Sequence, residues 1–246
     1  MSEQQSSGTY RILHLWADHG IEDEVLYGFG EVTRVGIDPE PNPFSNVVQG
    51  DARDPPVSGT WDLAVAHPRC QRFSIATPGG GTDPEDHPNE IPDARRVCRE
   101  LADHYIIENV PQAPLRDPVV YNGGSFGLPI HYPRAFETSF QVPRTGTAPR
   151  WSPDVGPLAE QGASGNAWVG GTDGWRLAKG YSHPWPGRDL KRHAVPAPYL
   201  RRLLYAWLTA VEAGSRSEQR AIVPATEGGN SRFVGAGTDR SGGNNE

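Results

Sequence analysis

Residues 63–66 (Leu-Ala-Val-Ala) constrain the fold most, because they form an apolar run without alternation that ends abruptly at a polar segment. Such a run is typical of a strand buried on both faces, as in a mainly parallel sheet covered by helices. The residues around it alternate between strand and helix patterns, which predicts an α/β layered fold. We expect strands at residues 10–15, 32–37, 47–48, 63–66 and 104–108, and helices at residues 21–29 and 94–104, the second capped by Asp93.

Polar side chains follow each of these predicted strands. Asp18, Asp38 and Asp51 come after the first three, Cys70 lies in the segment after the fourth, and Glu108 ends the fifth. In open α/β sheets ligands bind at the carboxyl ends of the strands. The sequence therefore predicts a site at this edge of the sheet.

Composition agrees with a soluble globular chain of 246 residues, 36% hydrophobic and 22% charged. No apolar run approaches the roughly 20 residues that span a bilayer, and residues 1–8 do not resemble a signal peptide. We therefore expect a cytoplasmic protein (in the host cytoplasm if the source is a virus) with no membrane partner. In that reducing setting Cys70 and Cys98 are more naturally free thiols than a disulfide.

The net charge of −7 does not by itself indicate a nucleic-acid partner. Phosphate binding needs only a local basic stripe. Arg95, Arg96 and Arg99 on the predicted helix 94–104 form one candidate, and an ordinary solvated helix face explains them equally well.

Each candidate also has a plain structural interpretation. Cys70 is open to the commonest fate of a free cysteine, a small buried hydrophobe, and Cys98 fits a structural role. Glu108 fits a surface or capping carboxylate, although the apolar residues before it favour the end of a buried strand.

Two motifs occur in order along the chain. Pro68-Arg69-Cys70-Gln71-Arg72-Phe73-Ser74 is followed by Glu108-Asn109-Val110-Pro111. Together they resemble the DNA cytosine-5 methyltransferases, and residues 125–140, with Arg134 before Ala-Phe-Glu-Thr, are similar to compact phage or virus-type members. Residues 194–199 resemble the closing element of that family. The resemblance covers residues 10–140 and 190–208.

The resemblance implies a Rossmann-like class I methyltransferase sheet with helices on both faces and a reduced target-recognition region. It implies that Cys70 adds covalently to a flipped cytosine, since a thiolate at C6 makes C5 nucleophilic. Glu108 would hold the base, Arg134 would lie beside it, and Gln71 and Ser74 would contact double-stranded DNA.

The methyl donor implied is S-adenosyl-L-methionine. The resemblance assigns its pocket to Trp16, Gly20, Asp38 (ribose), Asp51 (adenine) and Val195. The glycine-rich first element of the family is reduced here to residues 14–20, with only Gly20 kept. Arg69, Tyr132 and His193 also depart from the family pattern, so the catalytic motifs are better preserved than the cofactor loop.

The expected organisation is a catalytic core at residues 1–140, a loop-rich insertion at 141–189 that is a candidate for target recognition, a closing helix at 190–213 and a disordered tail at 214–246. We expect a monomer without a metal. One alternative is an inactive homologue that serves as a DNA-binding or partner-binding module. Another is an enzyme on the same fold that transfers a different one-carbon unit or modifies another nucleic acid.

Overall fold

The computed structural model describes residues 9–74, 83–146, 151–152, 156–157, 159–160 and 171–222. The chain divides into two units, Met1–Val211 and Glu212–Glu246, and the sheet and the site both belong to the first. None of the helices in the described ranges has the length and hydropathy needed to span a membrane.

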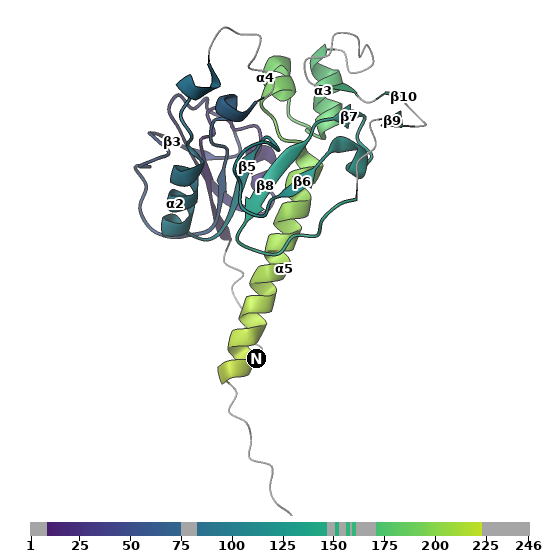
Figure 1. Ribbon diagram of the computed structural model, residues 1–246. Helices are drawn as coiled ribbons and strands as arrows, with labels where there is room; N and C mark the ends of the chain where they lie inside the picture. The colour runs from purple at the N-terminus through teal and green to yellow at the C-terminus, as the bar shows by residue number, and fades with distance from the viewer. Residues whose placement is uncertain are drawn as a thin grey trace, which may run out of the picture. The chain divides into compact units, whose positions relative to one another are not determined.

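The central element is a seven-stranded sheet with the order β3-β2-β1-β4-β5-β8-β6. The five strands from β3 to β5 are parallel, and β8 runs antiparallel to both of its neighbours, β5 and β6. These last three strands can be followed side by side in Figure 1. The strands are β1 (Tyr10–Leu15), β2 (Gly30–Gly36), β3 (Asn46–Gln49), β4 (Trp61–Ala66), β5 (Ala102–Asn109), β6 (Val119–Tyr121) and β8 (Arg134–Thr138).

Apolar side chains of alternate strand residues build a separate core on each face of the sheet. On one face Ile12, Val65 and Ile106 belong to a cluster with residues of α1, α3, α4 and α5. On the other face Leu13 and Ala64 pack with residues of α2. The helices are α1 (Asp23–Leu26), α2 (Ile91–Leu101), α3 (Gly171–Lys179), α4 (Gly187–Arg192) and α5 (Ala197–Ile222). The predicted Rossmann-like α/β sheet, mostly parallel and with helices on both faces, is confirmed.

Two predicted helices have different bounds in the structure. The first is a single turn, α1, because the chain must leave it to enter β2 at Gly30, whose missing Cβ lets the carbonyl of Tyr10 approach. The second, α2, begins at Ile91 rather than at residue 94, so Asp93 is not its cap; Glu90 takes that position. Proline is well tolerated in the first turn of a helix, and Pro92 lies there. The helix ends at Leu101 because β5 begins with the next residue.

The segment from residue 173 to Trp207 contributes many side chains to the core. Trp175, Tyr181 and Trp185, all within the predicted insertion, are buried in the larger apolar cluster with Leu203 and Trp207 of α5. Helix α5 continues through Gly214 to Ile222, past the expected start of a tail. Short pairs also occur: β9 (Trp151–Ser152) with β10 (Gly156–Pro157), and β7 (Ile130–His131) with β11 (Ala159–Glu160).

Candidate functional site

A cavity of about 260 Å³ lies at the carboxyl edge of the parallel strands. Its lining comes from residues that follow β1 and β4, from the end of β5 and from the start of β8. The three predicted catalytic residues, Cys70, Glu108 and Arg134, all line it. The sheet therefore brings together side chains that are far apart in the sequence.

Glu108 is the central polar group of this cavity. The antiparallel pairing of β5 with β8 sets Asn109 opposite Ala135, so the first residue of β8, Arg134, lies near the end of β5. Arg134 Nε lies 3.0 Å from Glu108 Oε1, and His67 Nδ1 lies 3.1 Å from Oε2. Both carboxylate oxygens thus have a partner, and the buried side chain is fixed in one orientation.

The backbone before Cys70 is anchored on three sides. His67 N donates to the carbonyl of Leu15 at 3.1 Å. Asn109 Nδ2 donates to the Pro68 carbonyl at 2.9 Å, and Arg69 N donates to Glu90 Oε2 at 3.1 Å. The asparagine of the Glu-Asn-Val-Pro motif therefore holds the loop that carries the cysteine. Cys70 itself is exposed and precedes the short 3-10 helix Gln71–Phe73.

The pKa of the Cys70 thiol is raised above its ordinary value. Desolvation contributes most, the negative charge of Glu108 adds to it, and Arg134 opposes it. In the free protein the thiol is therefore predominantly protonated at neutral pH, and nucleophilic attack requires a change in its surroundings that favours the thiolate.

Alkylation of Cys70 by iodoacetamide is expected to have a midpoint at higher pH than the roughly 8.5 of a free thiol. Glu108→Gln should move that midpoint down, because it removes a negative charge that raises the pKa, whereas Arg134→Gln should move it up. Peptide mass spectrometry across a pH series measures this, with buried Cys98, whose pKa burial raises to about 12, as the unreactive internal reference. A midpoint below that of a free thiol would contradict the raised pKa of Cys70 and the effect given to Glu108.

Tyr132 contacts two basic side chains, Arg134 and Lys179. The guanidinium carbon of Arg134 lies 3.8 Å from the centre of the Tyr132 ring, and Lys179 Nζ lies 3.7 Å from it. Lys179 is fully buried, donates to the Ala194 carbonyl at 2.6 Å, and has a pKa well below its ordinary value through burial and then the charge of Arg134. The ring of Tyr132 therefore packs against the guanidinium group of Arg134. No sequence motif predicted this contact.

Two histidines near Glu108, His67 and His14, were not predicted as site residues from the sequence. His14 is fully buried in β1, and its Nδ1 lies 2.5 Å from Asp23 Oδ1. Its ring lies edge-on to that of His67, with the centroids 5.0 Å apart. Burial lowers the pKa of His67, but the hydrogen bond to Glu108 and neighbouring carboxylates outweigh it and raise the pKa. The sequence did contain two signals that could have indicated them. His14 lies inside an apolar strand, and His67 directly follows another.

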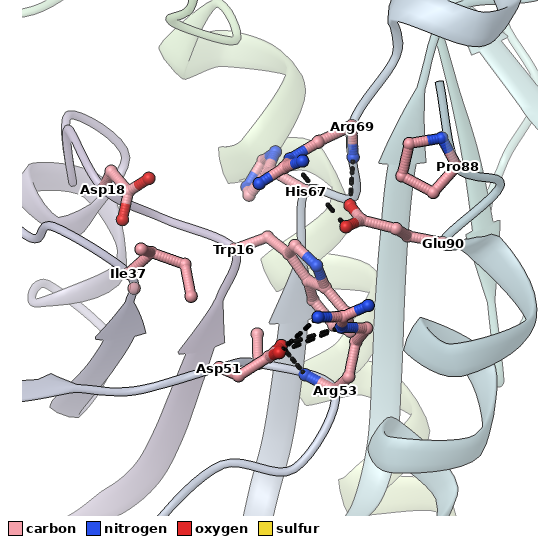
Figure 2. A pocket seen from close by; sticks show the side chains of 11 residues that line it. Trp16, Asp18, Ile37, Asp51, Arg53, His67, Arg69, Pro88 and Glu90 are labelled. Atoms are coloured by element: carbon pink, nitrogen blue, oxygen red, sulfur yellow. Dashed lines mark hydrogen bonds and ion pairs between the residues drawn. The ribbon is translucent and has the colours of Figure 1, made fainter. Parts of the chain in front are cut away.

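A second cavity, of about 130 Å³, adjoins the first. Trp16, Asp18, His67 and Arg69 line both. Figure 2 shows two ion pairs beside this cavity. Arg69 pairs with Glu90, and Arg53 pairs with Asp51. The second cavity has the place expected of a cofactor pocket, between the ends of β1, β2 and β3.

The structure brings only some of the predicted cofactor residues together. Trp16 and Asp51 line the second cavity and Gly20 lines the first. The Asp51 carboxylate is held by Arg53 at 2.6–3.0 Å, and this hydrogen bonding lowers its pKa. Asp38 is exposed outside the lining of these two cavities, and its N–H donates to Asp18 Oδ1 at 3.0 Å. Val195 is buried and also lies outside both.

Arg34 holds the loop of residues 17–20, which follows β1. Its buried guanidinium donates to the carbonyls of Ala17 (2.7 Å), Asp18 (2.6 Å) and Glu40. It also lies 2.9 Å from Asp23 Oδ2. Gly20, in the left-handed region at φ +60°, leaves room for it, since a Cβ there would lie 2.6 Å from the guanidinium. The position of the Arg34 side chain therefore requires a glycine at residue 20.

Of the two residues predicted to contact DNA, Gln71 lines the first cavity, whereas Ser74 follows the 3-10 helix outside the lining. Two arginines of the basic stripe considered on α2 have partners within the protein. Arg95 forms two hydrogen bonds to Glu137 at 2.7–2.8 Å, and Arg96 pairs with Glu100 at 3.0 Å.

Comparison with known proteins gave no match to a protein-family model and no match to a curated protein. Several solved structures are similar, two of which follow. Protein 1320 of Thermoplasma acidophilum is 12% identical over 53% of this chain and 78% of that one, with a TM-score of 0.35. PH1948 of Pyrococcus horikoshii, a proposed RNA methyltransferase, is 16% identical over 42% of this chain and 52% of that one, with a TM-score of 0.30.

Proposed function

We propose that this protein methylates C5 of cytosine in double-stranded DNA, with S-adenosyl-L-methionine as methyl donor and Cys70 as covalent nucleophile. The observation that carries the proposal is the convergence of Cys70, Glu108 and Arg134 on one cavity at the carboxyl edge of the sheet. An exposed thiol beside a fixed carboxylate and a guanidinium suits attack on an electron-poor ring whose developing charge needs stabilisation.

The chain's own groups divide the work as follows. The Cys70 sulfur forms a bond to C6 of the flipped base, which leaves C5 nucleophilic; after methylation the C5 proton departs and the sulfur–C6 bond breaks. Glu108, held by Arg134 and His67, contacts N3 and the exocyclic amine. Because the Glu108 charge raises the thiol pKa, sharing a proton with the base also favours the thiolate.

The second cavity fits the methyl donor in part. Trp16 offers an aromatic face, Ile37 an apolar contact, and Asp18 and Asp51 offer carboxylates to hydroxyl and amine groups. Arg53 must share Asp51 with an incoming adenine, since it now holds that carboxylate. When bound, S-adenosyl-L-methionine supplies an electrophilic methyl group. Asp38 and Val195 line neither cavity, so their roles in binding the methyl donor stay predictions from the sequence.

Duplex DNA in which every cytosine is 5-fluorocytosine is expected to become covalently attached to the protein when S-adenosyl-L-methionine is present. Fluorine at C5 blocks the proton loss that would release the thiol, and no knowledge of the target sequence is needed. Denaturing gels show the adduct and peptide mapping locates it. Cys70→Ser should abolish it and Cys98→Ser should not. An adduct that survives Cys70→Ser would overturn the assignment.

An inactive homologue that acts as a DNA-binding or partner-binding module is the second candidate. The Asp51–Arg53 pair and the position of Asp38 outside both cavities favour it. Calorimetric titration with S-adenosyl-L-methionine separates the two functions. Binding at micromolar concentration supports the enzyme, and no binding at millimolar concentration by a folded, DNA-binding protein supports the module.

A further inference from the structure

We propose that His14, Glu22 and His67 form a binding site for one divalent transition-metal ion of the Zn²⁺ class. The site is a wall of the first cavity, which Glu22 and His67 also line. This proposal differs from the sequence analysis, which expected a protein without a metal. The inference does not depend on the proposed methyl transfer, because it concerns the free protein.

The donor atoms already converge. One from each of the three side chains lies within 4.8 Å of the other two. A Zn²⁺ ion with ligands at about 2.0–2.1 Å in tetrahedral geometry holds its donors roughly 3.3 Å apart. Side-chain adjustments of about an ångström therefore complete the coordination. The residues come from β1, from the turn before α1 and from the loop after β4, so the ion would tie three segments together.

The two rings present free nitrogens in the arrangement that metal ligands adopt. His14 Nδ1 is bound by Asp23 and His67 Nδ1 by Glu108. In each ring Nε2 is buried and has no hydrogen-bond partner in the described part of the chain. Metal-binding histidines typically donate one ring N–H to a carboxylate, which directs the other nitrogen to the ion. His14, at 0% exposure, has no solvent to satisfy Nε2 otherwise.

Charge favours a cation at the same point. Glu22 is only 7% exposed, and its Oε1 accepts a hydrogen bond from Val195 N at 2.8 Å. Asp23 and Glu108 are paired with Arg34 and Arg134, whereas among the described residues no salt bridge is found for Glu22. A buried carboxylate without a direct ion pair is costly, and a divalent ion bound to it would lower that cost. Two imidazoles and one carboxylate suit Zn²⁺, Co²⁺, Ni²⁺ or Fe²⁺ better than Mg²⁺ or Ca²⁺.

A second group, His19, Asp189 and His193, also has its donors within 4.8 Å of one another. Its two rings are stacked, with an angle of 25° between their planes and centroids 4.5 Å apart. Parallel rings direct their nitrogens side by side rather than toward one point. The group therefore serves as the internal control.

The test is titration of the chelator-treated, full-length protein with Co²⁺, followed by Zn²⁺ competition against a chromophoric chelator. We expect one equivalent per chain, with visible cobalt bands and no thiolate charge-transfer band. Glu22→Gln keeps a carbonyl for Val195 N and should weaken binding by at least about 10–100-fold, the loss usual for even an outer partner of a metal site. His67→Gln should do the same and serves if Glu22→Gln does not fold, as judged by circular dichroism.

His19→Gln is the matched control and should leave the affinity unchanged. The proposal is overturned if the wild-type protein binds no stoichiometric ion, if Glu22→Gln and His67→Gln bind as tightly as wild type, or if only His19→Gln loses binding. None of these results bears on the covalent trapping of 5-fluorocytosine DNA, so failure of the metal site and failure of the proposed function are distinguishable.

Discussion

Replacement of Glu108 by glutamine is expected to slow methyl transfer to DNA by about 10²–10⁴-fold, the usual worth of general acid–base help, while DNA affinity changes little. The amide keeps the shape but has neither the charge nor the exchangeable proton that contact with the base requires. It also presents an N–H₂ group to Arg134 or His67, both of which donate to the carboxylate in the native protein. Single-turnover transfer of a labelled methyl group measures the effect.

Glu137→Gln is the matched control for that variant. Glu137 is also a buried carboxylate of the sheet bound to an arginine, Arg95, but it lies outside the lining of the first cavity. Its replacement should lower stability and leave the rate per folded molecule unchanged. Equal losses in both variants, or no loss in Glu108→Gln, would show that Glu108 is structural.

Replacement of Arg34 by methionine is expected to lower the free energy of unfolding by about 3–5 kcal/mol, the cost of leaving a buried charge without its partner. The variant leaves Asp23 without its arginine and the carbonyls of Ala17, Asp18 and Glu40 without their donor. Urea unfolding followed by circular dichroism measures the loss. Arg53→Met, which breaks the exposed pair with Asp51, should lower the free energy of unfolding far less, because water screens an exposed ion pair.

A second substitution shows whether charge is the cause. Adding Asp23→Asn to the Arg34→Met chain removes the uncompensated carboxylate and should recover part of the lost stability. No recovery, or an Arg34→Met loss no larger than that of Arg53→Met, would contradict the central role given to the Arg34–Asp23 pair.

The sequence predicted the parts of the fold that depend on local burial. Residues 10–15 form β1 as expected, and the polar residues after the strands meet at one edge because parallel strands end together. Helix bounds were less accurate, since Pro92 lies inside the first turn of α2 rather than before it.

The ionic network behind the site was not predicted at all. Periodicity shows that His14 and Arg34 lie in buried strands, but not that Asp23 joins them. That contact depends on how one helical turn packs across β1 and β2, which is a tertiary property. Part of the predicted insertion, including residues 161–170, lies outside the described residues, and target recognition stays a prediction.

The three anchors before Cys70 have a mechanical consequence. Hydrogen bonds to Leu15 and Asn109 of the sheet and to Glu90 at the start of α2 fix the backbone from His67 to Arg69. These three hydrogen bonds end at Arg69, so any displacement of the chain that follows must begin at Cys70 or later. The cysteine thus marks the boundary between a backbone segment that its neighbours hold and the short 3-10 helix that comes next.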